Sequence, residues 1–293
     1  MATLPHFLVL PTQLHRSILT LPREQKVVLV ELPKYFRSQR ATKAELVTYR
    51  ASLQALRERL LVKGYEVEYL EAPAFSSLQS VLKHLAAAGA TSLQTYPLPS
   101  FKEEHELVKA CKLLGISLKV VASQGFLFQS EWLPELRGEE RVASRFTSFL
   151  RQKLKLLVDG NGNPVGGSWK LPQVPKRKYT LEVTLPERNR YVEEAAAYVA
   201  KHFPRVKGGV AGVPSPVTFA DAEDQLEYVL EGDWQASPEQ ICERYIMPSV
   251  VLGLLLPGTV VQRLCQQKNT PPAAVEAFLR PVLKREWQRF QVS

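Results

Sequence analysis

The sequence contains little cysteine. Cys111, Cys242 and Cys265 are the only three among 293 residues, they lie far apart, and no CxxC or Cys/His spacing surrounds them. A zinc or iron–sulfur site built from this chain alone is therefore not expected. Scattered cysteines in odd number are typical of a reducing compartment, so we expect a cytoplasmic protein.

Long apolar stretches are also missing. No run approaches the ~20 residues that a helix needs to span a bilayer, so we expect no membrane partner. The N-terminal segment MATLPHFLVLPTQ has an apolar run, but no preceding positive charge and no small-residue cleavage site. We interpret it as a first strand rather than as a signal peptide.

The familiar catalytic and phosphate-binding motifs are absent from the sequence. No GxGxxG follows the first apolar run, where the residues are LPTQLHRS, and there is no P-loop, HExxH or GxSxG elsewhere. None of the five histidines stands beside a plausible Cys or Ser nucleophile, although a fold can bring distant residues together. The sequence therefore assigns no catalytic residue and no metal ligand.

Positive charge is what the sequence has in excess. The formal net charge is +9 and the sequence pI is near 9.4, a balance that favours contact with polyanions such as nucleic acid. A generally basic soluble enzyme would have the same totals, so clustering matters more than the sum. Much of the excess lies in two stretches: Arg145, Arg151, Lys153, Lys155, Lys170, Lys176, Arg177 and Lys178, and then Arg280, Lys284, Arg285 and Arg289.

The first 125 residues alternate between short apolar runs and amphipathic segments. The apolar runs are typical of buried strands, and the segments between them have helical spacing. Thr42 followed by Glu45 has the form of a capping box. This order predicts an α/β fold, with a Rossmann-like parallel sheet domain over residues 1–125. The expected strands are 6–10, 26–32, 65–71, 91–98 and 117–123, and the expected helices are 42–61, 76–90 and 103–116.

The pattern changes after residue 125. Residues 141–158 have a helical period and lead to the turn VDGNGNPVGG, which a Pro-rich stretch without regular period follows. Long loops of this kind are usually functional or connect domains. We expect a helix and an inter-domain linker over 126–190, then an α-helical region over 191–293. Its expected helices are 187–203, 218–232, 238–256, 257–268 and 271–291.

Three stretches resemble one branch of the photolyase/cryptochrome superfamily. LRQKLKLLVDGNGNPVGGSWKLP is similar to the LLMD–G–PVGGRWNFDAENR junction of the deoxyribodipyrimidine photolyase-related proteins, which include iron–sulfur bacterial cryptochromes and six-four photolyases. HFLVLPTQLHRS and VVLVELPKYF resemble the opening LILGDQL strand and the second strand of that family. VVLGLLLPGTVV and PPAAVEAFLRPVLKREWQRF resemble LNLGLLSPREVV and VEGFIRQIIGWREYVRG. The resemblance implies an antenna domain followed by the start of a flavin domain.

The sequence also departs from the family pattern. GDQL is replaced by Pro11-Thr12-Gln13-Leu14, and the acid of RWNFDAENR is missing after Trp169. HSLLSP, which the resemblance makes a flavin-phosphate contact, reads ERYIMP at 243–248 and lacks its hydroxyls. Family members continue beyond the segment that resembles WREYVRG, with most of the flavin pocket and the cluster cysteines. The family cofactors are FAD and ribolumazine. We therefore do not expect this chain to bind FAD without the help of another chain, and we expect no iron–sulfur cluster.

The resemblance also implies contacts to a ribolumazine antenna chromophore. It assigns them to Gln13, Leu14 and Glu31, at the ends of the first strands. Ligands of open α/β sheets usually bind at this edge, and the Glu31 carboxylate can accept hydrogen bonds from a ribityl chain or a ring amide. The alternative is that Glu31 pairs with Lys34 or Arg37 at the surface.

The junction after the turn leaves two interpretations open for Trp169. It is either a plug between the two domains, with its indole N–H bonded to a linker carbonyl, or a ring that stacks on a base or passes electrons. Lys170, Lys176, Arg177 and Lys178 follow it and are candidate contacts to nucleic-acid phosphates. The alternative for these four is a solvated linker.

The C-terminal helix carries Trp287 and Phe290 at helical spacing. We interpret them as core or partner-facing residues, because an uncovered apolar face on that helix invites a protein partner. Three functions remain open. The first is a photolyase-like protein that has lost catalysis and binds nucleic acid or a partner. The second is a flavoprotein, either a repair enzyme or a light sensor, completed by another chain, and the third is a structural scaffold.

Overall fold

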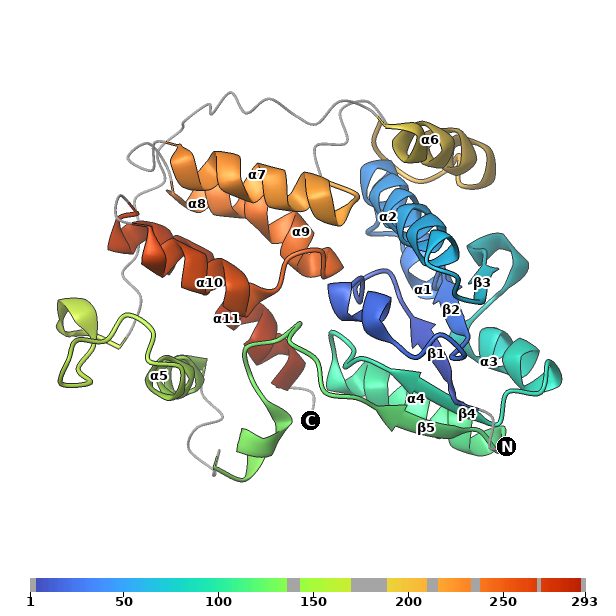
Figure 1. Ribbon diagram of the computed structural model, residues 1–293, viewed down its shortest axis with the longest axis horizontal. Coiled ribbons are helices and arrows are strands. Elements are labelled where there is room, and N and C mark those ends of the chain that lie inside the picture. The colour runs from blue at the N-terminus through green and yellow to red at the C-terminus, as the bar shows by residue number, and fades with distance from the viewer. Residues whose placement is uncertain are drawn as a thin grey trace.

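The computed structural model describes residues 4–135, 143–169, 189–209, 216–232, 238–267 and 270–290. Five parallel strands form one sheet in the order β3-β2-β1-β4-β5, with β1 at its centre (Figure 1). The parallel α/β sheet predicted from the alternating pattern is therefore confirmed. The strands are β1 (His6–Val9), β2 (Val27–Val30), β3 (Val67–Leu70), β4 (Ser92–Thr95) and β5 (Ser117–Val120).

Helices cover both faces of the sheet, because successive side chains of its central strands point to opposite faces. Phe7 packs in one core with α2 (Lys43–Val62). Leu8 packs in a second core with α3 (Leu78–Ala87) and α4 (Phe101–Leu113). Shorter helical turns are α1 (Pro33–Phe36) and the 3-10 turns Arg16–Thr20, Ala72–Ala74, Ser130–Glu135 and Val165–Gly167.

The N-terminus of α2 carries the capping box that the sequence predicts. The Glu45 N–H donates to Thr42 Oγ1 at 3.2 Å, and the Thr42 N–H donates to the Glu45 carboxylate at 2.7 Å. Two backbone donors at the open end of the helix are thereby satisfied.

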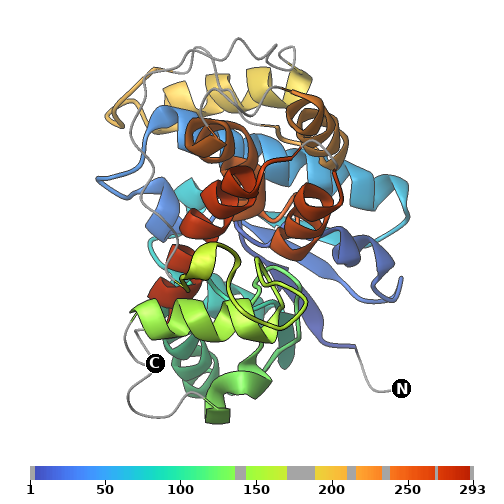
Figure 2. The same cartoon turned by 90° about the vertical axis from the view of Figure 1, so that its left-hand side faces the viewer.

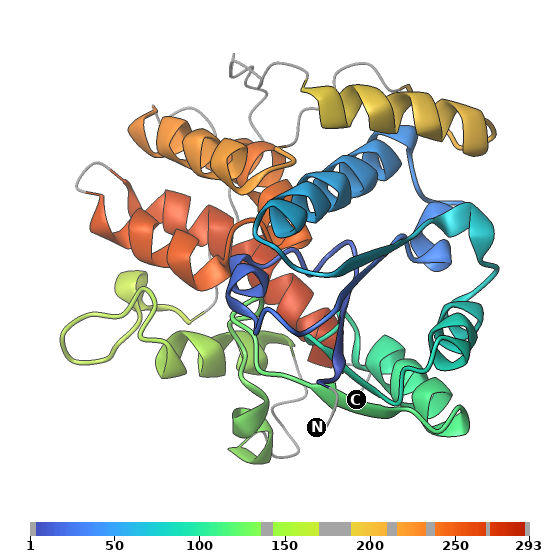
Figure 3. The ribbon, with the colours of Figure 1, turned by 45° about the vertical axis from the view of Figure 1, so that its right-hand side comes forward.

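A second helical layer lies on the outer side of α2. Helix α6 (Arg190–His202) runs along it, and Val47 and Ala51 of α2 pack with Ala195 and Val199 of α6 in a third buried cluster (Figure 3). The sequence groups α6 with the C-terminal helical region. In the structure α6 packs on the α/β part, where it completes a site described below.

The other helices pack on the α2 side of the sheet and share one continuous core with it. No helix in the described ranges is long and apolar enough to cross a membrane. The helices are α5 (Ala143–Lys153), α7 (Phe219–Glu231), α8 (Pro238–Ile241), a π-helical turn (Cys242–Ile246), α9 (Met247–Leu252), α10 (Pro257–Gln266) and α11 (Pro272–Phe290).

The segment expected as one helix over 238–256 is divided in the structure. The π-helical turn interrupts it, and the helix ends at Gly253, whose φ of +89° is left-handed. A left-handed residue is a common helix stop, and glycine adopts that conformation without steric cost.

The apolar face of α11 is covered from within the chain. Phe278 and Leu279 are fully buried, and α5, α9 and α10 pack against the helix (Figure 2). Trp287 is half-buried, with its ring centroid 5.4 Å from that of Phe146 on α5. Trp287 is thus a core contact. The side chain of Phe290 lies outside the described part, and a protein partner for this helix stays a prediction.

His15 lies where the sheet meets the C-terminal helices. The neighbouring Leu14 N–H donates to the Leu252 carbonyl at 2.9 Å, and the His15 ring shares a 2.8 Å hydrogen bond with Ser123 Oγ. Burial and the nearby Arg285 charge lower the pKa of His15 to about 4. The ring is therefore neutral at pH 7 and serves as a packed spacer between the two parts.

Glu286 of α11 forms a second link across the same junction. Its carboxylate accepts hydrogen bonds from the N–H groups of Leu127 and Phe128, at 2.9 and 3.2 Å. Burial raises the pKa of Glu286 to about 7, against the opposing effect of these N–H groups and of Arg285.

We expect Glu286 to make the stability depend on pH. Between its ordinary pKa of 4.5 and about 7, the folded chain binds a proton that the unfolded chain has released. Its contribution to the free energy of unfolding is therefore full below that range and falls as the pH rises through it. Urea unfolding should show that the wild type loses stability relative to Glu286→Gln between pH 5 and pH 8. If the difference in the free energy of unfolding between the two proteins stayed constant over this pH range, the raised pKa of Glu286 would be contradicted.

Candidate functional site

The predicted chromophore edge contains the switch point of the sheet, between β1 and β4, where chain connections leave in opposite directions. The Gln13 side chain spans this point. Its amide nitrogen donates to the Tyr96 and Pro97 carbonyls at 2.6 and 3.3 Å, and its oxygen accepts from the Leu10 N–H at 3.0 Å. Gln13 is 1% exposed and Leu14 is fully buried. The Gln13 side chain thus bonds to backbone groups of the chain itself, and the Leu14 side chain packs in the core.

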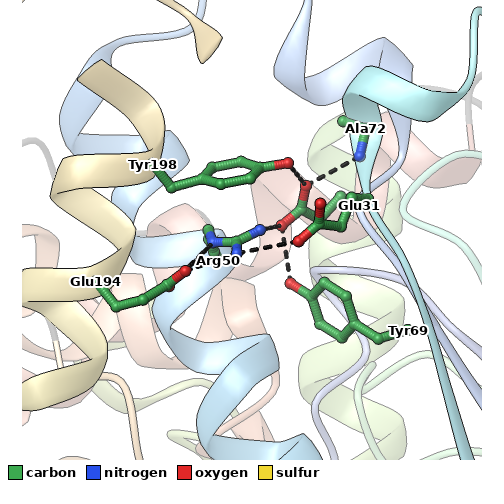
Figure 4. Close-up of polar contacts among 7 residues, drawn as sticks. Glu31, Arg50, Tyr69, Ala72, Glu194 and Tyr198 are labelled. Carbon is green, nitrogen blue, oxygen red and sulfur yellow. Dashed lines mark hydrogen bonds and ion pairs between the residues drawn. The ribbon is translucent and has the colours of Figure 1, made fainter. Parts of the chain in front are cut away.

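Glu31 follows β2 and lies at the centre of a buried polar network (Figure 4). One carboxylate oxygen accepts from the Arg50 guanidinium at 2.6 Å and from the Tyr69 hydroxyl at 2.8 Å. The other accepts from the Ala72 N–H at 2.9 Å and from the Tyr198 hydroxyl at 3.1 Å. Glu31 is fully buried, and its two oxygens have partners from four other elements: α2, β3, the Ala72–Ala74 turn and α6.

Arg50 of α2 joins this network to α6. It donates to Glu194 through two nitrogens, at 3.0 and 2.6 Å, and to Glu71 at 3.1 Å. Its guanidinium carbon lies 3.3 Å from the ring centroid of Tyr198. Burial lowers the pKa of Arg50, but the Glu194 hydrogen bonds and the Glu31 charge more than offset this and raise it. The guanidinium therefore stays charged and ties α6 to the sheet.

The tyrosines complete the network as donors. Burial and the Glu31 charge raise the pKa of both Tyr69 and Tyr198, so both phenols stay protonated. No further polar group is needed to satisfy Glu31.

These positions do not fit a chromophore contact. A ligand at Gln13 or Glu31 would have to break hydrogen bonds inside the chain, and Leu14 is enclosed in the core. The surface pairing considered for Glu31 is wrong. Lys34 pairs instead with Glu103 at 2.6 Å, and Arg37 donates to the Ala72 carbonyl at 3.4 Å.

The segment that stands in place of the flavin-phosphate motif does not fit a phosphate either. Tyr245 and Ile246 are buried in the core, and Glu243 is exposed and adds negative charge. In the described ranges no group of three or more His, Cys, Asp or Glu side chains is arranged to hold a metal ion.

The predicted phosphate contacts Lys170, Lys176, Arg177 and Lys178 lie outside the described residues, so they stay predictions. Trp169 before them is described and half-buried. Its carbonyl accepts from Arg151 at 2.6 Å, and the Arg151 guanidinium carbon lies 5.5 Å from its ring centroid. The contact that anchors this junction is thus made by Arg151.

Three arginines of the two basic stretches are engaged within the fold. Arg151 is 1% exposed and also donates to the Ser168 and Leu157 carbonyls. Arg289 is 6% exposed and pairs with Glu104 at 3.0 Å, and Arg285 donates to the Gly125 carbonyl at 2.8 Å. These three arginines hold the fold together and are not free for a polyanion.

A different basic surface is formed by two loops that are far apart in sequence. Residues 32–44 connect β2 to α2 through α1, and residues 195–209 contain the end of α6 and the turn after it. Neither stretch contains an acidic residue. The Lys43 N–H donates to the Lys207 carbonyl at 2.8 Å, which fixes the loops side by side (Figure 3). Together they carry Lys34, Arg37, Arg40, Lys43, Lys201, Arg205 and Lys207.

A groove of about 650 Å³ lies between these loops. Arg37, Arg205 and Lys207 line it, and none of the three forms an ion pair with another described residue. All three side chains are exposed. We call this the basic groove. Its lining residues are Phe36, Arg37, Ser38, Gln39, Ala41, His202, Phe203, Pro204, Arg205, Val206 and Lys207.

Comparison with known proteins gives the family. The family model described as deoxyribodipyrimidine photo-lyase-related protein matches residues 7–213, and no curated protein matches. A crystal structure of a bacterial class III photolyase from Agrobacterium tumefaciens is similar in fold, with a TM-score of 0.55 and 15% sequence identity. The match covers 99% of this chain and 60% of that one. The resemblance read from the sequence is thereby confirmed: the chain belongs to the deoxyribodipyrimidine photolyase-related family, within the photolyase/cryptochrome superfamily.

Proposed function

We propose that this photolyase-like protein binds nucleic acid through the basic groove and carries out no photorepair of its own. The observation that supports binding is the pair of acid-free stretches, which place three exposed cations, Arg37, Arg205 and Lys207, along one groove. Unpaired exposed cations attract a polyanion and release its counterions when it binds. The loss of repair is supported by the chromophore-edge and flavin-motif positions, whose side chains are used within the fold.

The cellular setting of this function is proposed from cysteine usage. Cys111 and Cys242 are buried free thiols, and Cys265 is an exposed one. Free thiols persist in a reducing compartment, so we infer a cytoplasmic protein.

The proposal is tested by anisotropy of labelled DNA titrated with protein over a salt series. The double variant Arg205→Gln/Lys207→Gln should weaken binding roughly tenfold and reduce the salt slope by about 1.4–1.8, since two phosphate contacts are lost. The matched control is Lys109→Gln/Lys112→Gln. It removes the same charge from exposed positions of α4, away from the groove, and should leave the slope nearly unchanged.

Two results would contradict the proposal. Equal losses of DNA affinity in the two double variants would mean that only the total charge of the protein matters. Binding that does not depend on salt, or no binding, would favour a structural scaffold instead. Stoichiometric FAD in the absorption spectrum of the purified protein would contradict the loss of repair.

A further inference from the structure

We propose that the basic groove receives single-stranded nucleic acid, with phosphates on its cationic rim and an unpaired base against its apolar floor. This inference rests on the proposed function and names the form of nucleic acid that binds. It is carried by the floor of the groove, because a surface that attracts phosphates alone needs no apolar floor.

The floor of the groove is built from residues of both loops. Phe36 and Phe203 line it, with their ring centroids 5.6 Å apart. Phe36 is fully buried and Phe203 is 9% exposed. Ala41, Pro204 and Val206 complete the apolar lining. A volume of about 650 Å³ lies within the range of pockets that hold small organic groups. The groove therefore suits a flat apolar body with charge at its edge.

His202 supplies an exposed aromatic ring beside this floor. Its ring centroid lies 4.5 Å from that of Tyr198, with an interplanar angle of 39°. Tyr198 is held by Glu31 and by the Arg50 guanidinium, so the buried network supports the histidine from behind. A ring fixed in this way is a platform on which a base can stack.

Duplex DNA presents phosphates and sugars to such a groove and keeps its bases stacked. It therefore gains from Arg37, Arg205 and Lys207 but not from the floor or from His202. A single strand gains from both. The structure thus predicts a preference for single strands that depends on His202 and not on the cations alone.

The experiment uses two labelled probes, an oligothymidylate and a DNA duplex of equal length, and two competitors, thymidine monophosphate and polyglutamate. We expect the single strand to bind about tenfold more tightly than the duplex. His202→Ala should remove about tenfold from single-strand binding and leave duplex binding nearly unchanged. His105→Ala, which truncates an exposed histidine of α4, is the matched control and should change neither.

The outcomes separate this inference from the proposed function. Equal binding of duplex and single strand, with equal loss in His202→Ala, overturns the single-strand assignment and leaves nucleic-acid binding intact. No binding of either probe overturns both. Competition by the monophosphate at the same concentration of nucleotides assigns the groove to free nucleotides, and equal competition by polyglutamate assigns it to acidic peptides. Either result overturns the inference. A thermal unfolding curve confirms that each variant is folded.

Discussion

Replacing Arg50 by methionine is expected to lower the free energy of unfolding by about 3–5 kcal/mol. Methionine keeps an unbranched apolar stem but removes the guanidinium that faces Glu31, which is fully buried. The carboxylate would retain hydrogen bonds from Tyr69, Tyr198 and the Ala72 N–H, but no positive charge would face it. An uncompensated buried charge is far more costly than the loss of a surface ion pair.

The measurement is urea unfolding followed by circular dichroism. Arg57→Met is the matched control, because Arg57 is an exposed arginine of the same helix, α2, and should cost less than about 1 kcal/mol. The double variant Glu31→Gln/Arg50→Met should be more stable than Arg50→Met alone, since it leaves no buried carboxylate unpaired. A double variant that is less stable would show that the charge of Glu31 is not what destabilises Arg50→Met.

The same network explains part of what the sequence can and cannot predict. The strands can be predicted from the sequence, because runs such as VVLV in β2 are apolar on both faces of a covered sheet. The sequence also places Glu31 at the carboxyl edge of that sheet, but it does not identify Arg50 as its partner. Arg50 stands between Leu46 and Leu53 on the buried stripe of α2, and a lone charge in such a stripe is the signal that identifies a buried ion pair.

The sequence contains no comparable signal for the basic groove. Its cations come from two stretches about 160 residues apart, and neither stretch alone is unusual in its charge. They become one surface only through the packing of α6 on α2 and the hydrogen bond between Lys43 and Lys207. In the denser basic stretches, by contrast, Arg151 and Arg285 donate to backbone carbonyls and Arg289 pairs with the half-buried carboxylate of Glu104. In the part of the chain that the structure describes, charge density along the sequence therefore does not by itself locate the exposed charge.

Gly253→Ala tests the junction between the sheet and the C-terminal helices and should cost about 3 kcal/mol. Gly253 has a φ of +89°, which costs an alanine about 1 kcal/mol. A Cβ there would also lie 2.5 Å from His15 Cδ2 and 3.1 Å from the Leu14 backbone nitrogen. Overpacking of this kind costs roughly 1–3 kcal/mol, and the backbone of Leu14 cannot move away without losing its bond to Leu252.

Gly89→Ala separates the two contributions. Gly89 has nearly the same φ, +90°, but a Cβ there would meet nothing within 4 Å, so only the left-handed backbone is strained. Urea unfolding should give a loss of about 1 kcal/mol for Gly89→Ala. Adding His15→Ala to Gly253→Ala should recover part of the larger loss, because it removes the ring that the new methyl group meets. Equal losses for the two glycine variants would mean that the junction yields to the added methyl group, and that His15 is not a fixed spacer between the sheet and the helices.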